Sequence, residues 1–292
     1  MSNIGFIGLG LMGAAMVQRL QDMGHSLTVM GNTTRHRIDK AVANGATEAA
    51  TARDLAAASD IVMLCMGTSD QVESRMLGQD GVIAGLKPGT VVIDFGTSLP
   101  ASTVMLGEKV AAARATLLDA PLGRTPSHAY EGKLNIMGAG DKAAFDTVRP
   151  VLDQLGENVF HLGPLGSGHT IKLINNFFAM TTANAMAEAF AIADKMGVPR
   201  QSVYDVMAAG PLHSGMMDFV KAYAIDGDSQ KLAFAVVNAN KDVGYYARMA
   251  SEAGVESIMS TSARTGLGLA VEAGWGDKLV PEMVDFYAEK FR

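Results

Sequence analysis

Three glycines close to the start of the chain, Gly8, Gly10 and Gly13, have the spacing Gly-x-Gly-x-x-Gly. Residues 3–7 before them predict a short buried strand, and residues 14–20 after them have the amphipathic pattern of a helix. In such a turn the first glycine permits the tight bend, the second lets the backbone approach a pyrophosphate, and the third lets the helix pack on the strand. The amides at the helix start then face the anion. This context favours a dinucleotide site over a structural glycine turn, and its predicted residues are Gly8, Gly10, Leu11, Met12 and Gly13.

The end of the second predicted strand, residues 26–30, discriminates between the two nicotinamide dinucleotides. NAD sites usually carry an acidic residue there for the adenosine ribose, whereas a ribose phosphate repels a carboxylate and attracts arginine. This chain has Gly-Asn-Thr-Thr-Arg-His-Arg over 31–37, with no acid. The stretch favours NADP, with NAD possible, and Asn32, Thr33 and Arg35 are the expected phosphate contacts. A solvated helix start with a few basic residues is the alternative interpretation.

The composition restricts the class of protein. The 292 residues are 48% hydrophobic and 18% charged, with a net charge of −6, which is typical of a soluble globular protein and argues against a nucleic-acid surface. The chain starts without the basic and apolar regions of a secretory signal. Its most apolar stretch, 177–193, is interrupted by polar residues and predicts a buried helix rather than a membrane span. We therefore expect a cytoplasmic protein in which this helix is buried between domains or subunits of a homo-oligomer, a dimer or tetramer.

Apolar runs and helical stretches alternate through the first half of the chain. This alternation predicts an α/β fold of the Rossmann type, with a doubly wound parallel sheet and helices on both faces. Its expected strands are 4–7, 26–30, 61–66, 90–94, 116–120, 133–137 and 159–162. After Gly163 only helical patterns follow, so we expect a dinucleotide-binding domain over 1–163 and an all-helical domain over 164–292. The expected helices of the second domain are 169–196, 200–209, 215–224, 231–252, 255–273 and 279–290.

Three further stretches carry a resemblance to a known family. They are Asp-Ala-Pro-Leu-Gly-Arg-Thr over 119–125, Gly-Ser-Gly-His-Thr-Ile-Lys-Leu-Ile-Asn-Asn over 166–176, and Phe234 with Lys241-Asp242. Together with the opening glycine turn they resemble the β-hydroxyacid dehydrogenase family, which includes 3-hydroxyisobutyrate dehydrogenase and tartronate semialdehyde reductase. The resemblance runs nearly end to end. It implies an oxidoreductase that moves a hydride between a nicotinamide cofactor and a small hydroxy acid or aldehyde.

The same resemblance implies that Lys172 is the catalytic residue. Asn176 follows at i+4 and therefore shares its helix face, while Asn175 lies on the adjacent face. A lysine ammonium can give a proton to a carbonyl oxygen as hydride arrives, and the neutral amine can accept the hydroxyl proton in the reverse direction. We expect Asn176 to orient the lysine or the substrate oxygen. A lysine on a helix is, taken alone, more often a solvated surface residue.

One departure from the family pattern bears on the substrate. The family usually has Ser-Gly-Gly where this chain has Gly123-Arg124-Thr125, and arginine offers a planar fork suited to an anion. This variant looks like that of the branch interconverting 3-sulfolactaldehyde and 2,3-dihydroxypropane-1-sulfonate, which implies that Arg124, Thr125 and Asn175 hold a sulfonate. A carboxylate would satisfy the same donors, as in 3-hydroxyisobutyrate, tartronate semialdehyde or succinic semialdehyde. A structural ion pair is the alternative role for the arginine.

The remaining predicted site residues follow from the family positions. Lys241 is expected to bind substrate and cofactor, and the other predicted cofactor residues are Met66, Gly67, Thr97 and Phe234. No histidine pair has metal-ligand spacing and no acidic or cysteine cluster supports one, so we predict no metal. Cys65, the single cysteine, is expected to be a small core residue. A non-catalytic dinucleotide-binding module is the alternative function.

Overall fold

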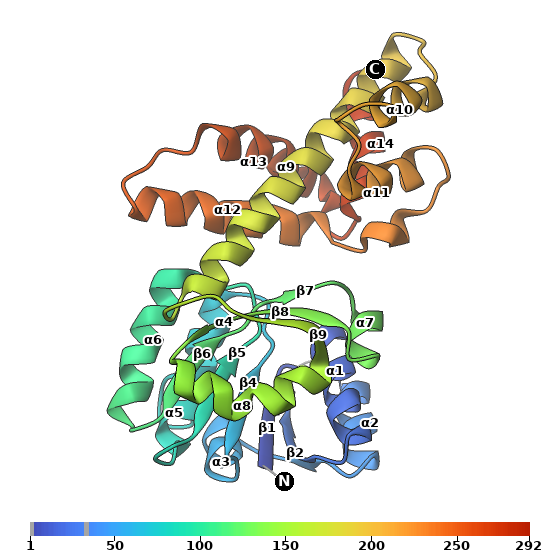
Figure 1. Ribbon diagram of the computed structural model, residues 1–292. Helices are drawn as coiled ribbons and strands as arrows, with labels where there is room; N and C mark the ends of the chain where they lie inside the picture. Colours follow the sequence, from blue (N-terminus) through green and yellow to red (C-terminus); the bar gives the residue numbers. More distant parts are fainter. Residues whose placement is uncertain (1–2, 32–34) are drawn as a thin grey trace. The chain divides into compact units, whose positions relative to one another are not determined.

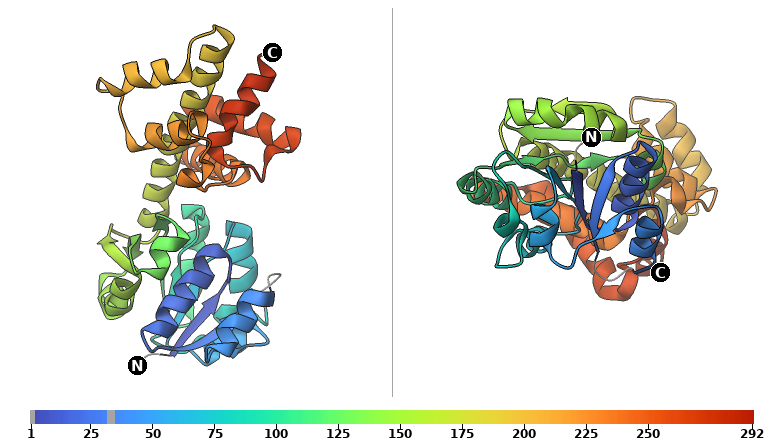
Figure 2. Two further views of the ribbon diagram at one scale, coloured as in Figure 1. Left: turned by 90° about the vertical axis from the view of Figure 1, so that its right-hand side faces the viewer. Right: turned by 90° about the horizontal axis from the view of Figure 1, so that it is seen from below.

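The computed structural model describes residues 3–31 and 35–292, and the chain divides into two compact units (Figures 1 and 2). The first unit ends at Lys172 and the second comprises Leu173–Arg292. The sequence placed a boundary at residue 163, before the helix α9 (Ser167–Lys195). The two compact units of the structure meet inside that helix, between Lys172 and Leu173.

The first unit contains a sheet with the predicted Rossmann-type core. Within its described residues, six strands run parallel in the order β3-β2-β1-β4-β5-β6, and β8 then pairs antiparallel with β6. β7 pairs antiparallel with β8, and β9 pairs parallel with it. The strands are β1 (Asn3–Ile7), β2 (Ser26–Met30), β3 (Thr47–Glu48), β4 (Ile61–Leu64), β5 (Val91–Asp94), β6 (Thr116–Asp119), β7 (Leu122–Gly123), β8 (Leu134–Gly140) and β9 (Gly156–His161).

Strand β8 reverses direction because no long helix separates it from β6. The connection holds only β7 and the five-residue helix α7 (Pro126–Tyr130), whereas a parallel crossover needs a helix long enough to return across the sheet. The fold class is as predicted, but the direction of this strand was not foreseen.

Helices cover both faces of the parallel strands (Figure 1). Strand β4 shows why, since Ile61 and Met63 belong to one hydrophobic cluster while Val62 and Leu64 belong to another. A strand buried on both faces reads as a continuous apolar run. The other helices of this unit are α1 (Leu11–Asp22), α2 (Arg35–Ala43), α3 (Ala52–Ala57), α4 (Ser69–Met76), α5 (Val82–Gly85), α6 (Pro100–Ala112) and α8 (Lys142–Leu155).

The second unit is helical, as predicted. A core that includes Phe190, Val243 and Leu267 holds its helices together. The helix expected over 231–252 starts later, at Val236, after a 3₁₀ turn over Ser229–Leu232. Among the described residues no helix combines the length and the apolar character that crossing a membrane requires. The helices after α9 are α10 (Arg200–Ala208), α11 (Gly215–Ala224), α12 (Val236–Glu252), α13 (Ile258–Ala270) and α14 (Met283–Lys290).

Candidate functional site

The glycine turn joins β1 to α1 and has the geometry of a phosphate-binding turn. Gly8 has a φ of +97°, and a Cβ there would collide with the carbonyl oxygen of Cys65. A Cβ at Gly13 would collide with the carbonyl oxygen of Gly8, so the helix packs directly on the turn. Gly10, which precedes the first helical residue, faces open space, where a Cβ would meet no described atom within 4 Å. Neighbouring atoms therefore leave no room for a side chain at Gly8 and Gly13, whereas the space beside Gly10 is free. A bound pyrophosphate needs this free space next to the backbone.

A cavity of about 470 Å³ opens beside this turn. Four predicted cofactor residues line it, namely Gly8, Gly10, Met66 and Gly67. Helix α4 contributes four wall residues that were not predicted, Asp70, Gln71, Ser74 and Arg75. Their spacing on α4 puts them on one helix face, shortly after the predicted cofactor residues Met66 and Gly67, and this spacing was the available signal.

Arg35, expected to contact a phosphate, is bound to carboxylates instead. Its Nη1 and Nη2 donate to the two oxygens of Glu48 at 2.7 Å each, and its Nε donates to Asp39 at 2.8 Å. These bonds raise the pKa of the Arg35 guanidinium and lower that of Glu48. The prediction did not include the two-residue strand β3, which pairs with β2 and brings Glu48 to this position. Asn32 and Thr33, the other expected phosphate contacts, lie outside the described residues.

The predicted catalytic residues lie one turn apart on α9. Lys172 is half-buried, Asn175 is exposed and Asn176 is buried. The Asn175 amide donates to Oδ1 of Asn176 at 3.2 Å. The helical spacing of Lys172 and Asn176 therefore gives the shared face that the sequence predicted.

A polar cluster inside the second unit surrounds Asp242 on α12. The Asn176 amide donates to Oδ2 of Asp242 at 2.7 Å, and Nζ of Lys241 lies 2.9 Å from Oδ1. Nζ of Lys241 also lies 5.2 Å from the ring centre of Tyr245. One buried carboxylate thus orients two predicted site residues, although sequence reasoning gave Asp242 no role. The same unit contains Phe234, partly buried against the helical core.

The Gly-Arg-Thr segment lies at β7 and the turn after it. Arg124 has a φ of +76°, a backbone conformation that favours glycine. Its Nη1 donates to the carbonyl oxygen of Lys133 and pairs with Glu157, so the structural ion pair exists. Both contacts use the same nitrogen, and among residues 3–31 and 35–292 no hydrogen bond to Nε or Nη2 is present. The Thr125 hydroxyl contacts Ser127 and His128 at 2.7 Å each.

Two sequence profiles of known families match the chain. A sequence profile for the NAD binding domain of 6-phosphogluconate dehydrogenase matches residues 3–163, and one for the NAD-binding region of NADP-dependent 3-hydroxyisobutyrate dehydrogenase matches residues 166–287. The 3-sulfolactaldehyde reductase of Escherichia coli K12 is 30% identical over 285 residues, covering 94% of this chain and 92% of that protein. The 2-hydroxy-3-oxopropionate reductase of the same organism is 32% identical over 215 residues, covering 74% and 73%.

A solved structure shows the same fold. The 3-hydroxyisobutyrate dehydrogenase of Mycobacterium tuberculosis superposes with a TM-score of 0.84 at 24% identity, covering 98% of this chain and 99% of that one. The chain belongs to the 3-hydroxyisobutyrate dehydrogenase-like family of β-hydroxyacid dehydrogenases. It is an NAD(P)-dependent oxidoreductase, as the sequence resemblance implied.

A second cavity of this dehydrogenase lies apart from the predicted site residues. An apolar groove of about 530 Å³ runs along α9 and α10, lined by residues such as Ile192 and Met196, and it contains none of them. Across the described part of the chain, no three His, Cys, Asp or Glu side chains are arranged to hold a metal ion.

Proposed function

We propose that this β-hydroxyacid dehydrogenase reduces a small anionic aldehyde, with the pair 3-sulfolactaldehyde and 2,3-dihydroxypropane-1-sulfonate as its favoured substrate and product. The nicotinamide cofactor supplies the hydride. Lys172 supplies the proton to the developing alkoxide and accepts it in the reverse direction. Asn176 orients the lysine or the substrate oxygen, because Asp242 fixes its amide.

The Arg124 side chain is the observation that carries the choice of substrate. Nη1 is held by Glu157 and the Lys133 carbonyl, while the edge formed by Nε and Nη2 has no partner among the described residues. A guanidinium fixed on one side can offer the other to a planar or tetrahedral anion. Thr125 and Asn175 are the additional donors that we assign to this anion, and Gly123 completes the segment. The relative from Escherichia coli named for a sulfonate aldehyde also covers nearly the whole chain.

A carboxylate-bearing aldehyde is the second candidate. Glu157 already balances part of the Arg124 charge, which lowers the demand for a strong anion in this segment. One relative at 32% identity is named as a 2-hydroxy-3-oxopropionate reductase. Tartronate semialdehyde, succinic semialdehyde and 3-hydroxyisobutyrate are therefore the substrates to compare.

We propose NADP as the preferred dinucleotide, with NAD as the alternative. The stretch 31–37 contains no acidic residue, and Nη1 of Arg37 lies 3.5 Å from the carbonyl oxygen of Leu9 in the glycine turn. In the first unit we assign cofactor contacts to Thr97 and to the predicted residues of the glycine turn and the cavity. In the second unit we assign them to Phe234 and Lys241. Exposed apolar residues of α9, such as Phe178 and Met196, support a homo-oligomer, a dimer or tetramer.

The test is steady-state turnover with NADH and NADPH against 3-sulfolactaldehyde and the carboxylate aldehydes, measured for the wild type and Lys172→Ala. We expect the highest kcat/KM with NADPH and the sulfonate, and loss of at least about 10²-fold in kcat for the variant. Equal kcat/KM for sulfonate and carboxylate would remove the substrate proposal. Full turnover by Lys172→Ala would remove the catalytic assignment.

A further inference from the structure

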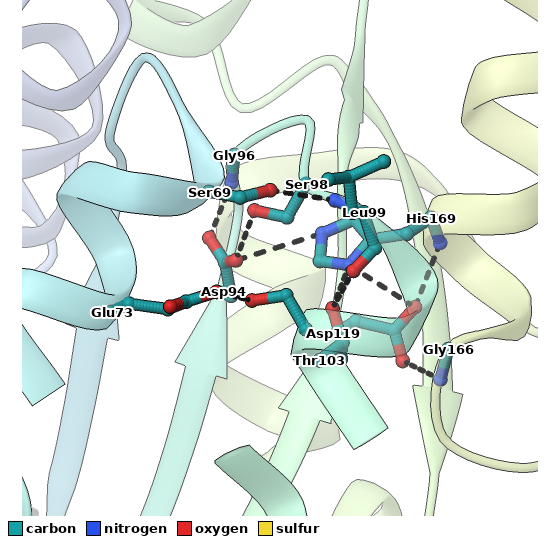
Figure 3. A network of polar contacts seen from close by, with 11 residues as sticks. Ser69, Glu73, Asp94, Gly96, Ser98, Leu99, Thr103, Asp119, Gly166 and His169 are labelled. Carbon is teal, nitrogen blue, oxygen red and sulfur yellow. Dashed lines mark hydrogen bonds and ion pairs between the residues drawn. The ribbon is translucent and has the colours of Figure 1, made fainter. Parts of the chain in front are cut away.

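A buried polar network lies in the first unit at the ends of β5 and β6 (Figure 3). His169 and Asp119 are fully buried, and Asp94 and Thr103 are 2% exposed. Figure 3 shows the His169 ring between the carboxyl groups of Asp94 and Asp119. Burying ionisable groups costs free energy unless every group is paired, so the contacts of each one are informative.

Asp119 caps the helix that carries Lys172. Its Oδ1 accepts the backbone N–H of Gly166 at 2.8 Å, and its Oδ2 accepts that of His169 at 2.7 Å. The first amides of a helix have no partner inside the helix, and a carboxylate also complements the positive end of the helix dipole. The cap comes from the last residue of β6 rather than from the residue before the helix. The start of α9 is thereby fastened to the sheet.

Gly168 brings the helix into direct contact with the sheet. A Cβ at this position would collide with the carbonyl oxygen of Met137 in β8 and would lie 2.8 Å from Oδ2 of Asp119. The first turn of α9 thus has no room to shift toward the strands, and the two hydrogen bonds of Asp119 keep it from shifting away.

The imidazole of His169 connects this helix start to the loop after β5. Its Nδ1 lies 2.8 Å from the hydroxyl of Thr103 on α6, and its Nε2 lies 3.7 Å from Oδ2 of Asp94, without a hydrogen-bond partner among the described residues. Asp94 accepts the N–H of Gly96 and the hydroxyl of Ser98, each at 2.8 Å. These bonds fix the loop on either side of Thr97.

We propose that Asp119 and His169 are positioning residues that hold Lys172 in register with the loop carrying Thr97. This inference rests on the proposed function, in which Lys172 transfers the proton and Thr97 contacts the cofactor. Lys172 follows His169 by three residues and Gly168 by four, so it stands one turn beyond the fastened segment. A small displacement of a proton donor slows the chemical step far more than it weakens binding of either ligand.

The test compares variants of Thr103, whose hydroxyl contacts His169 three residues before Lys172. Thr103→Val keeps the side-chain volume and removes the hydroxyl partner of His169, whereas Thr103→Ser keeps the hydroxyl. Ser59→Ala is the matched control. Ser59 is buried like Thr103, and its hydroxyl likewise donates to the carbonyl oxygen four residues earlier, at Leu55, but it precedes β4 at the opposite end of the sheet. Asp119→Asn removes the charge of the cap.

Thr103→Val and Asp119→Asn are expected to lower kcat about tenfold or more, with KM and the Kd for NADPH within twofold of wild type. Thr103→Ser should keep the wild-type kcat, because it keeps the hydroxyl. Ser59→Ala should lower the Tm without changing kcat. If Asp119→Asn does not fold, the Thr103 series decides. An unchanged kcat in folded Thr103→Val overturns the inference, as does a kcat loss that Ser59→Ala shares. If Lys172→Ala is inactive while Thr103→Val is fully active, only this inference fails; if Lys172→Ala is fully active, the proposed function itself fails.

Discussion

The side-chain amide of Asn176 donates a 2.7 Å hydrogen bond to Oδ2 of Asp242, and both side chains are buried in the second unit. The other oxygen of the same carboxylate lies 2.9 Å from Nζ of Lys241. One carboxylate therefore orients an amide to which we assign a catalytic role and an ammonium to which we assign a binding role. Hydrogen bonds to a buried charge are stronger than neutral ones, so this arrangement is rigid.

Asp242→Asn is expected to lower kcat/KM by roughly 10- to 100-fold, because the neutral amide cannot hold both partners in their present orientation. The free energy of unfolding should fall by about 1–3 kcal/mol. Asp226→Asn is the matched control, since Asp226 pairs with Lys221 on the surface of the same unit. A folded Asp242→Asn with wild-type kcat/KM would contradict the role given to this carboxylate.

Arg124→Gly tests whether the open edge of the guanidinium binds the substrate anion. Glycine tolerates the φ of +76°, which costs an L-residue about 1–2 kcal/mol, so relief of this strain offsets the lost ion pair and the fold is kept. The KM for 3-sulfolactaldehyde should rise about 10- to 100-fold, as expected for a hydrogen bond to a charged group, with a smaller change in kcat. Glu157→Gln keeps an acceptor for Nη1 and removes the balancing charge, so it should lower the KM. An unchanged KM in Arg124→Gly would leave the residue with its structural contacts alone.

Glu48→Gln tests the cofactor preference. In the present structure Glu48 binds both terminal nitrogens of Arg35, which keeps this arginine from a ribose phosphate. Removing the carboxylate charge should lower the Kd for NADPH by about two- to fivefold, the range of an exposed ion pair, and leave the Kd for NADH unchanged. Titration of both cofactors by fluorescence checks this, with Glu131→Gln, at a distant surface pair with Lys133, as the control. An equal change in the Kd for NADH and for NADPH would show that Arg35 does not bind the ribose phosphate.

The residues that were predictable are those whose signal is local in the sequence. The glycine turn and the parallel strands follow from apolar runs and glycine spacing, and the structure contains them. The partner of Arg35 was not predictable, because a two-residue strand with no hydrophobic pattern brings Glu48 to it. Asp242 meets Asn176 across 66 residues of sequence, and no local spacing encodes that contact. Strand β8 was predicted, but its antiparallel direction was not.

Cys65 is expected to react slowly with thiol reagents in the folded protein. Burial, assisted by the nearby Asp94 carboxylate, raises the pKa of its thiol from 9.0 to about 12. The thiolate is the nucleophile, and the half-buried Cys65 lines the cavity beside the glycine turn, so access alone does not protect it. An aromatic disulfide reagent at pH 8 should therefore label the unfolded chain within minutes and the folded chain more slowly, because the folded thiol keeps its proton. Rapid labelling of the native protein would contradict the raised pKa.

The same shift makes stability depend on pH. Between pH 9.0 and about 12 the unfolded thiol has lost its proton while the folded one retains it, so the unfolded state binds fewer protons and stability falls as pH rises. At pH 10 this term amounts to about 1 kcal/mol. Urea unfolding at pH 8 and pH 10 should show a smaller loss for Cys65→Ala than for the wild type. Equal losses in the two proteins would mean that Cys65 does not contribute to the pH dependence.

Substitutions at Gly10 and Gly13 distinguish the role of the glycine turn in cofactor binding from its role in packing. A methyl group at Gly10 meets no described atom within 4 Å, so Gly10→Ala should fold with an unchanged Tm and fill the space that a pyrophosphate needs. Its Kd for NADPH should rise at least about tenfold, since the phosphate loses close contact with the helix amides. A methyl group at Gly13 instead collides with the backbone oxygen of Gly8, so Gly13→Ala should lower the Tm even without cofactor. Thermal unfolding with and without NADPH distinguishes the two cases, because only a protein that still binds is stabilised by the ligand. If Gly10→Ala kept the full NADPH-induced rise in Tm, the pyrophosphate would have to bind away from this turn.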